Sequence, residues 1–374
     1  MMLLCRTYEA GGAMAIHILD ISVETLAIIN KLISLGKYES VDQFLAISLR
    51  NQLVIENVSQ QETRSNVREE REVPVEEPPR NVTAHSIKRR SEWSAVSVDL
   101  EQLPSQEGIT EPLWGQYYRY LPLKLALRVI AAHAMSDPVD LEQATDLATT
   151  EAAILSGLLR HADDLRKPLG LLSLSVGFPN GRNPEKSRNR YASQYVGAFS
   201  RSGQLYGFAS DIGFLVHPEN SGETAIQLTS AGARFTAISN PILDNGDLNE
   251  PLSSEEVDYL LGRIAARMPG ERIQLSGVLK SISEGASDPS ELRECMAEIY
   301  RNELRQMWQK NPWSDNKVAL MVSGATSRLI EMGHVERKRQ GQHVSYVLTG
   351  NWEGALGTLA QPSSGGRAKT EEGE

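Results

Sequence analysis

Cysteine is nearly absent from this sequence: Cys5 and Cys295 are the two thiols among 374 residues. Two thiols cannot build a disulfide framework or a four-thiolate zinc site. No apolar run approaches the ~18 residues that a membrane helix requires. The MLLC start also lacks the cationic region, apolar core and cleavage site of a signal peptide. We therefore expect a soluble, cytoplasmic protein with reduced thiols.

An excess of basic charge is also lacking. The 38 Lys and Arg residues are outnumbered by 48 Asp and Glu residues, which gives a net charge of −10. This balance excludes bulk attraction to nucleic acid or anionic membranes, so any such binding must come from local basic patches. At roughly 100–200 residues per domain, the length predicts two or three folded units.

Catalytic motifs are missing as well. The seven histidines are scattered, with no HExxH pair and no cysteine at metal-ligand spacing. The phosphate-binding pattern GxxxxGK[ST], a GxGxxG after a strand and the nucleophile pattern GxSxG do not occur. The sequence therefore predicts a protein that is not an enzyme, with no catalytic residues, no metal site and no cofactor.

The N-terminal region begins with a leader, residues 1–14, which is either disordered or an overcalled start. Residues 15–57 then follow the pattern strand, helix, turn, helix (IHILDIS, VETLAIINKLISLGKYES, VDQFLAISLRNQL). About 43 residues cannot bury a sufficient core alone, so we expect this unit to fold as a homodimer.

Residues 15–57 resemble the ribbon-helix-helix family of small dimeric DNA-binding proteins, and GKYES is the most distinctive match. The resemblance implies an antiparallel ribbon formed by two copies, with polar side chains in the major groove. Neither face of the predicted strand carries Arg or Lys, and Asp20 lies on one of them. We therefore expect dimerisation as its main role and DNA contact as a secondary one.

Residues 58–110 mix both charge signs and contain almost no periodic apolar positions. Such a composition cannot offset the entropy of ordering the chain, which predicts a disordered linker.

Residues 111–245 resume folded sequence. LPLKLALRVIAAHAM predicts an amphipathic helix, DLEQATDLA and TTEAAILSGLLRHADDL predict two helices joined at Ala-Thr-Thr, and GQLYGFASDIGFLVH is helix-like. The segment 166–201 has seven basic residues and one acidic residue, a local reversal of the overall charge. Phosphate contacts from such a loop would supply binding affinity, although a solvated basic surface is the alternative. The candidate DNA-binding residues here are Arg182, Lys186, Arg188 and Arg190.

Residues 246–353 begin with helices, and Ser253 with Glu256 forms a capping-box pattern. A short amphipathic helix at 323–332 then ends at Gly333, and two alternating strands follow around a QGQ turn. We expect Ala325, Leu329 and Ile330 to face inward. Residues 354–374 predict a disordered tail. The candidate DNA-binding residues here are Thr326, Ser327 and Arg328 on the helix and Arg337, Lys338 and Arg339 on the hairpin.

The segment from Ser323 to LTG resembles a winged helix-turn-helix, in which a recognition helix enters the major groove and a β-hairpin contacts the adjacent backbone or minor groove. A looser resemblance of the same kind covers residues 121–235, where TAIQLTSAG resembles the closing strand. Its recognition helix is either TTEAAILSGLLRH or GQLYGFASDIGF. A winged helix that makes protein contacts alone is the alternative.

Together these patterns predict a mainly α fold with small β elements: a ribbon-helix-helix-like unit, a disordered linker and tandem winged-helix-like domains. The predicted function is a dimeric protein that binds double-stranded DNA, as a transcriptional regulator or a DNA-maintenance factor. The alternative is a non-enzymatic adaptor subunit, with protein partners, of a DNA-processing, chromosome-organising or defence complex.

Overall fold

The computed structural model is mainly helical and divides into two compact units, Met1–Thr83 and Ala84–Glu374. Each is considered by itself. The structure describes residues 2–8, 14–20, 29–31, 33–34, 40–41, 93–97, 100–101, 103–105, 109–134, 137–167, 171–181, 183–219, 221–305, 313–340 and 343–360.

The first unit contains a β-hairpin. Strand β1 (Met2–Tyr8) pairs antiparallel with β2 (Met14–Asp20), from Met2 opposite Asp20 to Tyr8 opposite Met14. The predicted strand at 15–22 is confirmed as far as Asp20. Of the two alternatives for the leader 1–14, disorder does not hold for residues 2–8, which form β1 and pair with the next segment, and the overcalled start stays a prediction. Of the two predicted helices, residues 29–31, 33–34 and 41 are helical, and most other positions lie outside the described residues.

The second unit begins around a central helix, α4 (Tyr120–Ala134), which is buried from Tyr120 to Ala131 and carries Pro122 in its first turn. A three-stranded antiparallel sheet has the order β3 (Val139–Asp140), β7 (Ala225–Leu228) and β6 (Leu215–Val216). Helices α8 (Ser230–Ala237) and α9 (Pro241–Asn245) follow β7. The predicted helix at α4 and the predicted strand and helix at β7 and α8 are confirmed.

The two helices predicted for 141–165 form one continuous helix, α5 (Leu141–Arg166). The Ala-Thr-Thr segment does not break it, because no glycine or proline lies at the expected corner; the one glycine of α5, Gly157, lies further along the helix. Its buried face runs straight through the expected corner, with Ala148, Ala152 and Leu155 fully buried.

Between α5 and β6 lie α6 (Pro184–Tyr191), the π-helix η3 (Ala192–Val196), β4 (Ala198–Phe199), β5 (Leu205–Tyr206) and the single-turn helix α7 (Phe208–Asp211). The prediction that 203–217 is helical is therefore wrong for most of its length. Gly207 and Gly213 adopt φ angles of 130° and 76°, a conformation that ends helices and favours glycine.

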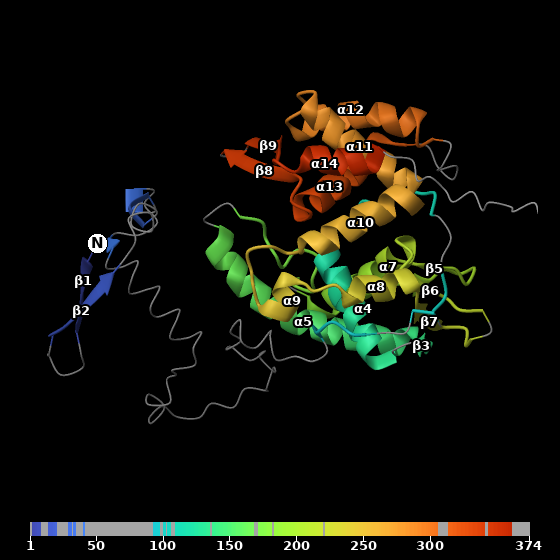
Figure 1. The fold of residues 1–374 in the computed structure, drawn as a ribbon, viewed down its shortest axis with the longest axis horizontal. Helices are drawn as coiled ribbons and strands as arrows, with labels where there is room; N and C mark the ends of the chain where they lie inside the picture. The colour runs from blue at the N-terminus through green and yellow to red at the C-terminus, as the bar shows by residue number, and fades with distance from the viewer. Residues whose placement is uncertain are drawn as a thin grey trace, which may run out of the picture. The chain divides into compact units, whose positions relative to one another are not determined.

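The remaining helices are α10 (Ser254–Arg267), α11 (Pro269–Ser283), α12 (Pro289–Asn302) and α13 (Asp315–Glu331). The hairpin β8 (Val335–Gln340) and β9 (His343–Leu348) follows, and then α14 (Trp352–Ala360). In Figure 1, α10 runs between the group α11–α14 and the group α4–α9. The capping box of Ser253 and Glu256 and the predicted hairpin are confirmed.

Two segments predicted to be disordered are partly ordered. In the predicted tail 354–374, residues up to Ala360 belong to α14, which packs on α10 and α11 and buries Ala355 and Leu359. In the predicted linker 58–110, Trp93 is fully buried and donates from its indole nitrogen to Glu151 at 2.9 Å. Residues 58–92 and 361–374 lie outside the described residues.

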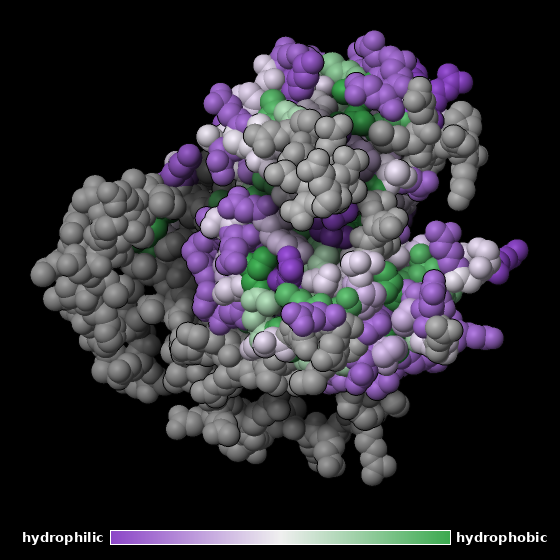
Figure 2. Space-filling model, turned by 45° about the vertical axis from the view of Figure 1, so that its right-hand side comes forward, coloured by the Kyte–Doolittle hydropathy of each residue, from purple (hydrophilic) through white to green (hydrophobic). Residues whose placement is uncertain are grey.

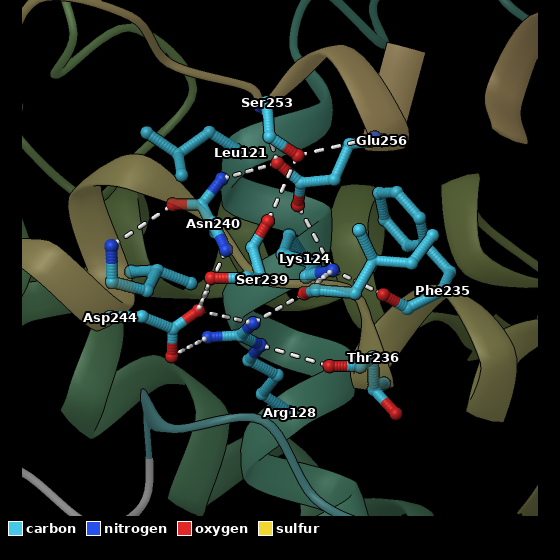
Figure 3. A network of polar contacts seen from close by, with 12 residues as sticks. Leu121, Lys124, Arg128, Phe235, Thr236, Ser239, Asn240, Asp244, Ser253 and Glu256 are labelled. Carbon is cyan, nitrogen blue, oxygen red and sulfur yellow. Dashed lines mark hydrogen bonds and ion pairs between the residues drawn. The ribbon is translucent and has the colours of Figure 1, made fainter. Parts of the chain in front are cut away.

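A buried polar network joins α4 to α9 and α10 (Figure 3). The Lys124 ammonium lies 2.9 Å from the Glu256 carboxylate, and both side chains are completely buried. The Arg128 guanidinium donates two hydrogen bonds, each of 2.8 Å, to the Asp244 carboxylate. Asn240 donates to Glu256 at 2.8 Å and caps α9. Because these contacts connect residues of 111–245 with residues of 246–353, both predicted modules belong to one compact unit.

No described helix combines the length and the apolar character that crossing a membrane requires.

Candidate nucleic-acid interface

Helix α13 carries the first group of predicted DNA-binding residues, and it is buried on most sides. Arg328 is fully buried and Thr326 is 2% exposed, while Ser327 is half-buried. The expectation that these side chains face outward is therefore wrong for Thr326 and Arg328. Arg328 instead forms an ion pair of 2.8 Å with Glu271 of α11 and donates to the carbonyl oxygen of Tyr117 at 2.6 Å.

The segment before α4 covers α13. Gly115 and Gly324 lie so close that a Cβ atom on Gly324 would come within 2.5 Å of the Gly115 carbonyl oxygen. At the end of α13, the Glu331 carboxylate accepts hydrogen bonds from the backbone N–H groups of Tyr120 and Leu121, where α4 begins. Burial raises the pKa of Glu331 to about 7. The side of α13 that a recognition helix would present to DNA is thus used for packing.

The hairpin β8–β9, called the basic hairpin below, remains exposed. Arg337, Lys338 and Arg339 are exposed on β8, and Lys338 has a weak contact of 3.9 Å with Glu336. The backbone N–H of Tyr346 donates to the carbonyl oxygen of Ser287, which fixes β9 to the body of the unit. The hairpin projects beside α13 and α14 (Figure 1). Its three cations are exposed, as contact with phosphates would require.

The connection between β6 and β7 is the corresponding hairpin of the other predicted module, and its charge is different. It carries Glu219 and Glu223 and has no Arg or Lys. Carboxylates repel phosphates, so this connection is poorly suited to contact DNA. The two hairpins therefore differ in charge: β8–β9 is basic, and the connection between β6 and β7 is acidic.

Helix α6 carries the second group of predicted DNA-binding residues. Lys186, Arg188 and Arg190 are exposed on it, and none of them forms an ion pair with a described residue. The fourth predicted residue, Arg182, lies outside the described residues. Asn183 caps the helix by accepting from the Lys186 N–H at 2.9 Å. The basic segment therefore presents three cations on one rigid element.

Buried contacts hold α6 in place. The Tyr191 hydroxyl donates to the carbonyl oxygen of Pro122 at 2.8 Å, and its ring stacks on Tyr195 at 5.3 Å. The loop before α6 is held by the Asp163 carboxylate, which accepts from the N–H groups of Leu174 and Ser175 at 2.6 and 2.9 Å. Tyr191 and Tyr195 are thus core residues that anchor the basic helix.

Arg119, just before α4, is a buried cation that contacts α13. It donates to the carbonyl oxygen of Ser327 at 2.7 Å. Burial lowers the pKa of Arg119. This side chain is therefore part of the packing around α13.

A groove of about 880 Å³ lies beside α6. Its size falls within the range of roughly 300–1,000 Å³ that is usual for ligand sites. The groove combines three aromatic rings, two cations of α6, several amide and hydroxyl groups and one carboxylate. Its lining residues are Trp114, Gln116, Tyr117, Gly181, Asn183, Lys186, Ser187, Asn189, Arg190, Ser193, Gln194, Tyr206 and Asp211.

The aromatic rings of the groove differ in exposure. Tyr117 is buried and stacks on Phe208, with ring centroids 4.9 Å apart and planes 5° apart. Tyr206 is 45% exposed and is, with Leu171, one of two large hydrophobic side chains exposed among the described residues. On the face that Figure 2 draws, hydrophilic residues cover most of the described surface and hydrophobic residues lie between them in small groups. An exposed ring such as Tyr206 is therefore unusual on this protein.

The carboxylate of the groove belongs to Asp211, which accepts a hydrogen bond of 2.9 Å from the Tyr117 hydroxyl. Burial raises the pKa of Asp211 to about 6 and, together with the Asp211 charge, raises the pKa of Tyr117. Among the described residues that line the groove, Asp211 is the one carboxylate and there is no histidine. Within the described part of the chain, no three His, Cys, Asp or Glu side chains are arranged to hold a metal ion.

The sequence predicted the cations of the groove but not its rings. Lys186 and Arg190 were found from the density of basic residues. Trp114, Tyr117 and Tyr206 come from separate segments, WGQYYRY and GQLYGF. The cluster of aromatic residues in WGQYYRY is the signal that was available.

No protein-family model matches this chain, and no curated protein or solved structure is significantly similar to it.

Proposed function

We propose that the protein binds double-stranded DNA through α6 and the basic hairpin, and that it acts as a homodimeric transcriptional regulator or DNA-maintenance factor. The observation that carries the proposal is the pair of exposed cation groups in an acidic chain. Lys186, Arg188 and Arg190 lie on one element and Arg337 and its neighbours on the other. Exposed cations that contact phosphates release the counterions of DNA, which drives association.

The order of elements supports the winged-helix resemblance for both modules. The C-terminal module has three helices, α11, α12 and α13, followed by the hairpin β8–β9. Between α11 and α12, the backbone at Ser287 forms a hydrogen bond with Tyr346 of β9, at the place where a winged helix has its first strand. In the other module, the helix α4 is followed by the strands of a three-stranded sheet in the order β3, β7 and β6. Because α13 is buried, we assign DNA contact to the hairpin and to α6 and not to α13.

Dimerisation is assigned to residues 15–57. In the described part of the first unit the sheet has two strands, and a two-stranded hairpin is marginally stable in water. Each strand of such a hairpin has one edge without a partner strand in the same chain. Association with a second copy would supply the burial that a unit of this size lacks.

The burial of α13 favours a second candidate, a non-enzymatic adaptor subunit of a DNA-processing, chromosome-organising or defence complex. A winged-helix module whose recognition helix is covered resembles a protein-docking module more closely than a groove reader. The net charge of −10 is consistent with it. In this candidate, the basic hairpin would bind an acidic protein partner.

Fluorescence anisotropy with mixed duplex DNA at about 50 and 200 mM salt tests the first proposal, because phosphate-driven binding weakens by orders of magnitude over this range. Replacing Arg337, Lys338 and Arg339 by Ala should weaken binding to all sequences and reduce the salt slope by up to about 3. A triple variant with unchanged affinity and slope would remove the hairpin from the interface. No binding at the lower salt would favour the adaptor.

A further inference from the structure

We propose that the groove beside α6 binds an unpaired nucleotide, with its base on the exposed tyrosine and its phosphate on the two cations of α6. This inference rests on the proposed function, since it names the form of nucleic acid that this part of the surface accepts. Neither the sequence patterns nor the winged-helix resemblance predicts such a site.

The cations of the groove lie on one face of α6. Lys186 and Arg190 are four residues apart, so they lie on the same face of α6, and both line the groove. Arg188 is equally exposed but does not line it. Two positive charges of the groove therefore come from neighbouring positions of one helix face, where Cβ atoms lie about 6 Å apart.

Three aromatic side chains line the groove, Trp114, Tyr117 and Tyr206. Tyr206 presents an exposed ring, and Tyr117 is held in place by stacking on Phe208. Trp114 lies at the edge, with the Lys317 ammonium 5.9 Å from its ring centroid. Aromatic rings next to cations are the combination with which proteins hold single-stranded nucleic acid, since the bases stack on the rings while the cations contact the backbone. The bases of an intact duplex are stacked on one another and cannot reach such rings.

Polar side chains complete the lining of the groove. Gln116 and Gln194 are joined by a hydrogen bond of 3.0 Å, and Asn183, Asn189 and Ser193 also line the groove. Amides can both donate to and accept from the edge of a base, as unpaired bases require. The Asp211 carboxylate is already used as the acceptor of the Tyr117 hydroxyl. The groove thus offers aromatic rings for the base of a nucleotide, amides for the polar edge of that base and cations for its phosphate.

An unpaired base with its phosphate has two sources, a single strand of nucleic acid and a free nucleotide. The test uses the full-length protein with a labelled oligo(dT) of about 16 nucleotides and a mixed duplex of the same length, measured by anisotropy. Unlabelled dTMP is the competitor. Displacement of oligo(dT) by dTMP would identify the free nucleotide as the ligand, and its failure to displace would identify the strand.

Three variants test the ring and the cations. Tyr206→Ala should weaken oligo(dT) binding about tenfold, the effect of losing one stacked base. Tyr206→Phe should keep wild-type affinity because the ring remains. Lys186→Ala should weaken oligo(dT) binding more than Arg188→Ala does, although both remove one charge from the same helix. Tyr206 is an exposed side chain, so the fold is expected to survive its truncation.

The outcomes separate this inference from the proposed function. Oligo(dT) binding that is unchanged in Tyr206→Ala, or that falls equally in Lys186→Ala and Arg188→Ala, would overturn the groove as the site. If the protein binds the duplex but not oligo(dT), the inference fails and the proposed function stands. If it binds neither, the proposed function fails as well.

Discussion

Arg328 and Glu271 form an ion pair of 2.8 Å in which both side chains are completely buried. Glu271 also accepts a hydrogen bond of 2.9 Å from the backbone N–H of Leu113. The pair therefore fastens α13 to α11 and to the segment before α4. It replaces the contact with DNA that the local pattern around Arg328 suggested.

Replacing Arg328 by Met should destabilise the protein by about 3–5 kcal/mol, because the Glu271 carboxylate would remain buried without its partner. The double variant Arg328→Met with Glu271→Gln should recover part of this loss, since no uncompensated charge remains. Urea unfolding followed by circular dichroism measures both. A variant Arg328→Met that unfolds like wild type but no longer binds DNA would restore α13 as the recognition helix.

Replacing Gly324 by Ala should also destabilise the protein, by about 1–3 kcal/mol, although Ala is the better helix former. The new Cβ would lie 2.5 Å from the Gly115 carbonyl oxygen and 2.7 Å from its Cα atom, and backbone atoms cannot easily move away. Gly262→Ala in α10 is the matched control, because no atom lies within 4 Å of its Cβ position. The free energy of unfolding of Gly262→Ala should rise by about 0.5–1 kcal/mol. Equal urea midpoints for the two variants would contradict the close approach.

Much of the secondary structure could be predicted because its causes are local. The capping box at Ser253 and Glu256 and the alternation of β8 and β9 depend on residues close together in the chain. The helix α13 was placed correctly for the same reason, although it begins earlier than the predicted Ser323.

The burial of α13 could not be predicted because its causes are distant in sequence. Arg328 meets Glu271, 57 residues earlier, and Gly324 meets Gly115. The periodicity of one helix cannot reveal that a second surface covers its polar side. The groove was only half predicted for a related reason: its cations lie in one segment, but Trp114, Tyr117 and Tyr206 are brought to them by the fold.

The buried carboxyl group of Glu331 should make stability depend on pH. Its pKa is raised from an ordinary value near 4.5 to about 7. A raised pKa means that the folded state binds the proton more tightly than the unfolded state, so this contribution is complete below pH 4.5 and is lost as the pH rises through 7. Relative to Glu331→Gln, the wild type should lose roughly 3 kcal/mol of stability between these pH values.

Urea unfolding of wild type and Glu331→Gln at several pH values measures this difference. Asp211 titrates in a similar range, with a pKa of about 6, but it is present in both proteins and its effect cancels. Glu298→Gln, at an exposed position of α12, is the control and should leave the pH dependence unchanged. A wild-type curve parallel to that of Glu331→Gln would show that the Glu331 carboxyl has no raised pKa.

Removing residues 1–83 should separate self-association from DNA binding. The second unit has its own core and its own ion pairs, including Lys124 with Glu256 and Arg328 with Glu271, so we expect 84–374 to remain folded. Light scattering should give a dimer for the full chain and a monomer for 84–374.

The shortened protein keeps α6 and the basic hairpin, so its binding to a short duplex should persist. It should nevertheless be weaker on DNA with two sites, where linking the modules raises their effective concentration. A dimeric 84–374 would place the self-association surface in the helical unit and remove that role from residues 15–57.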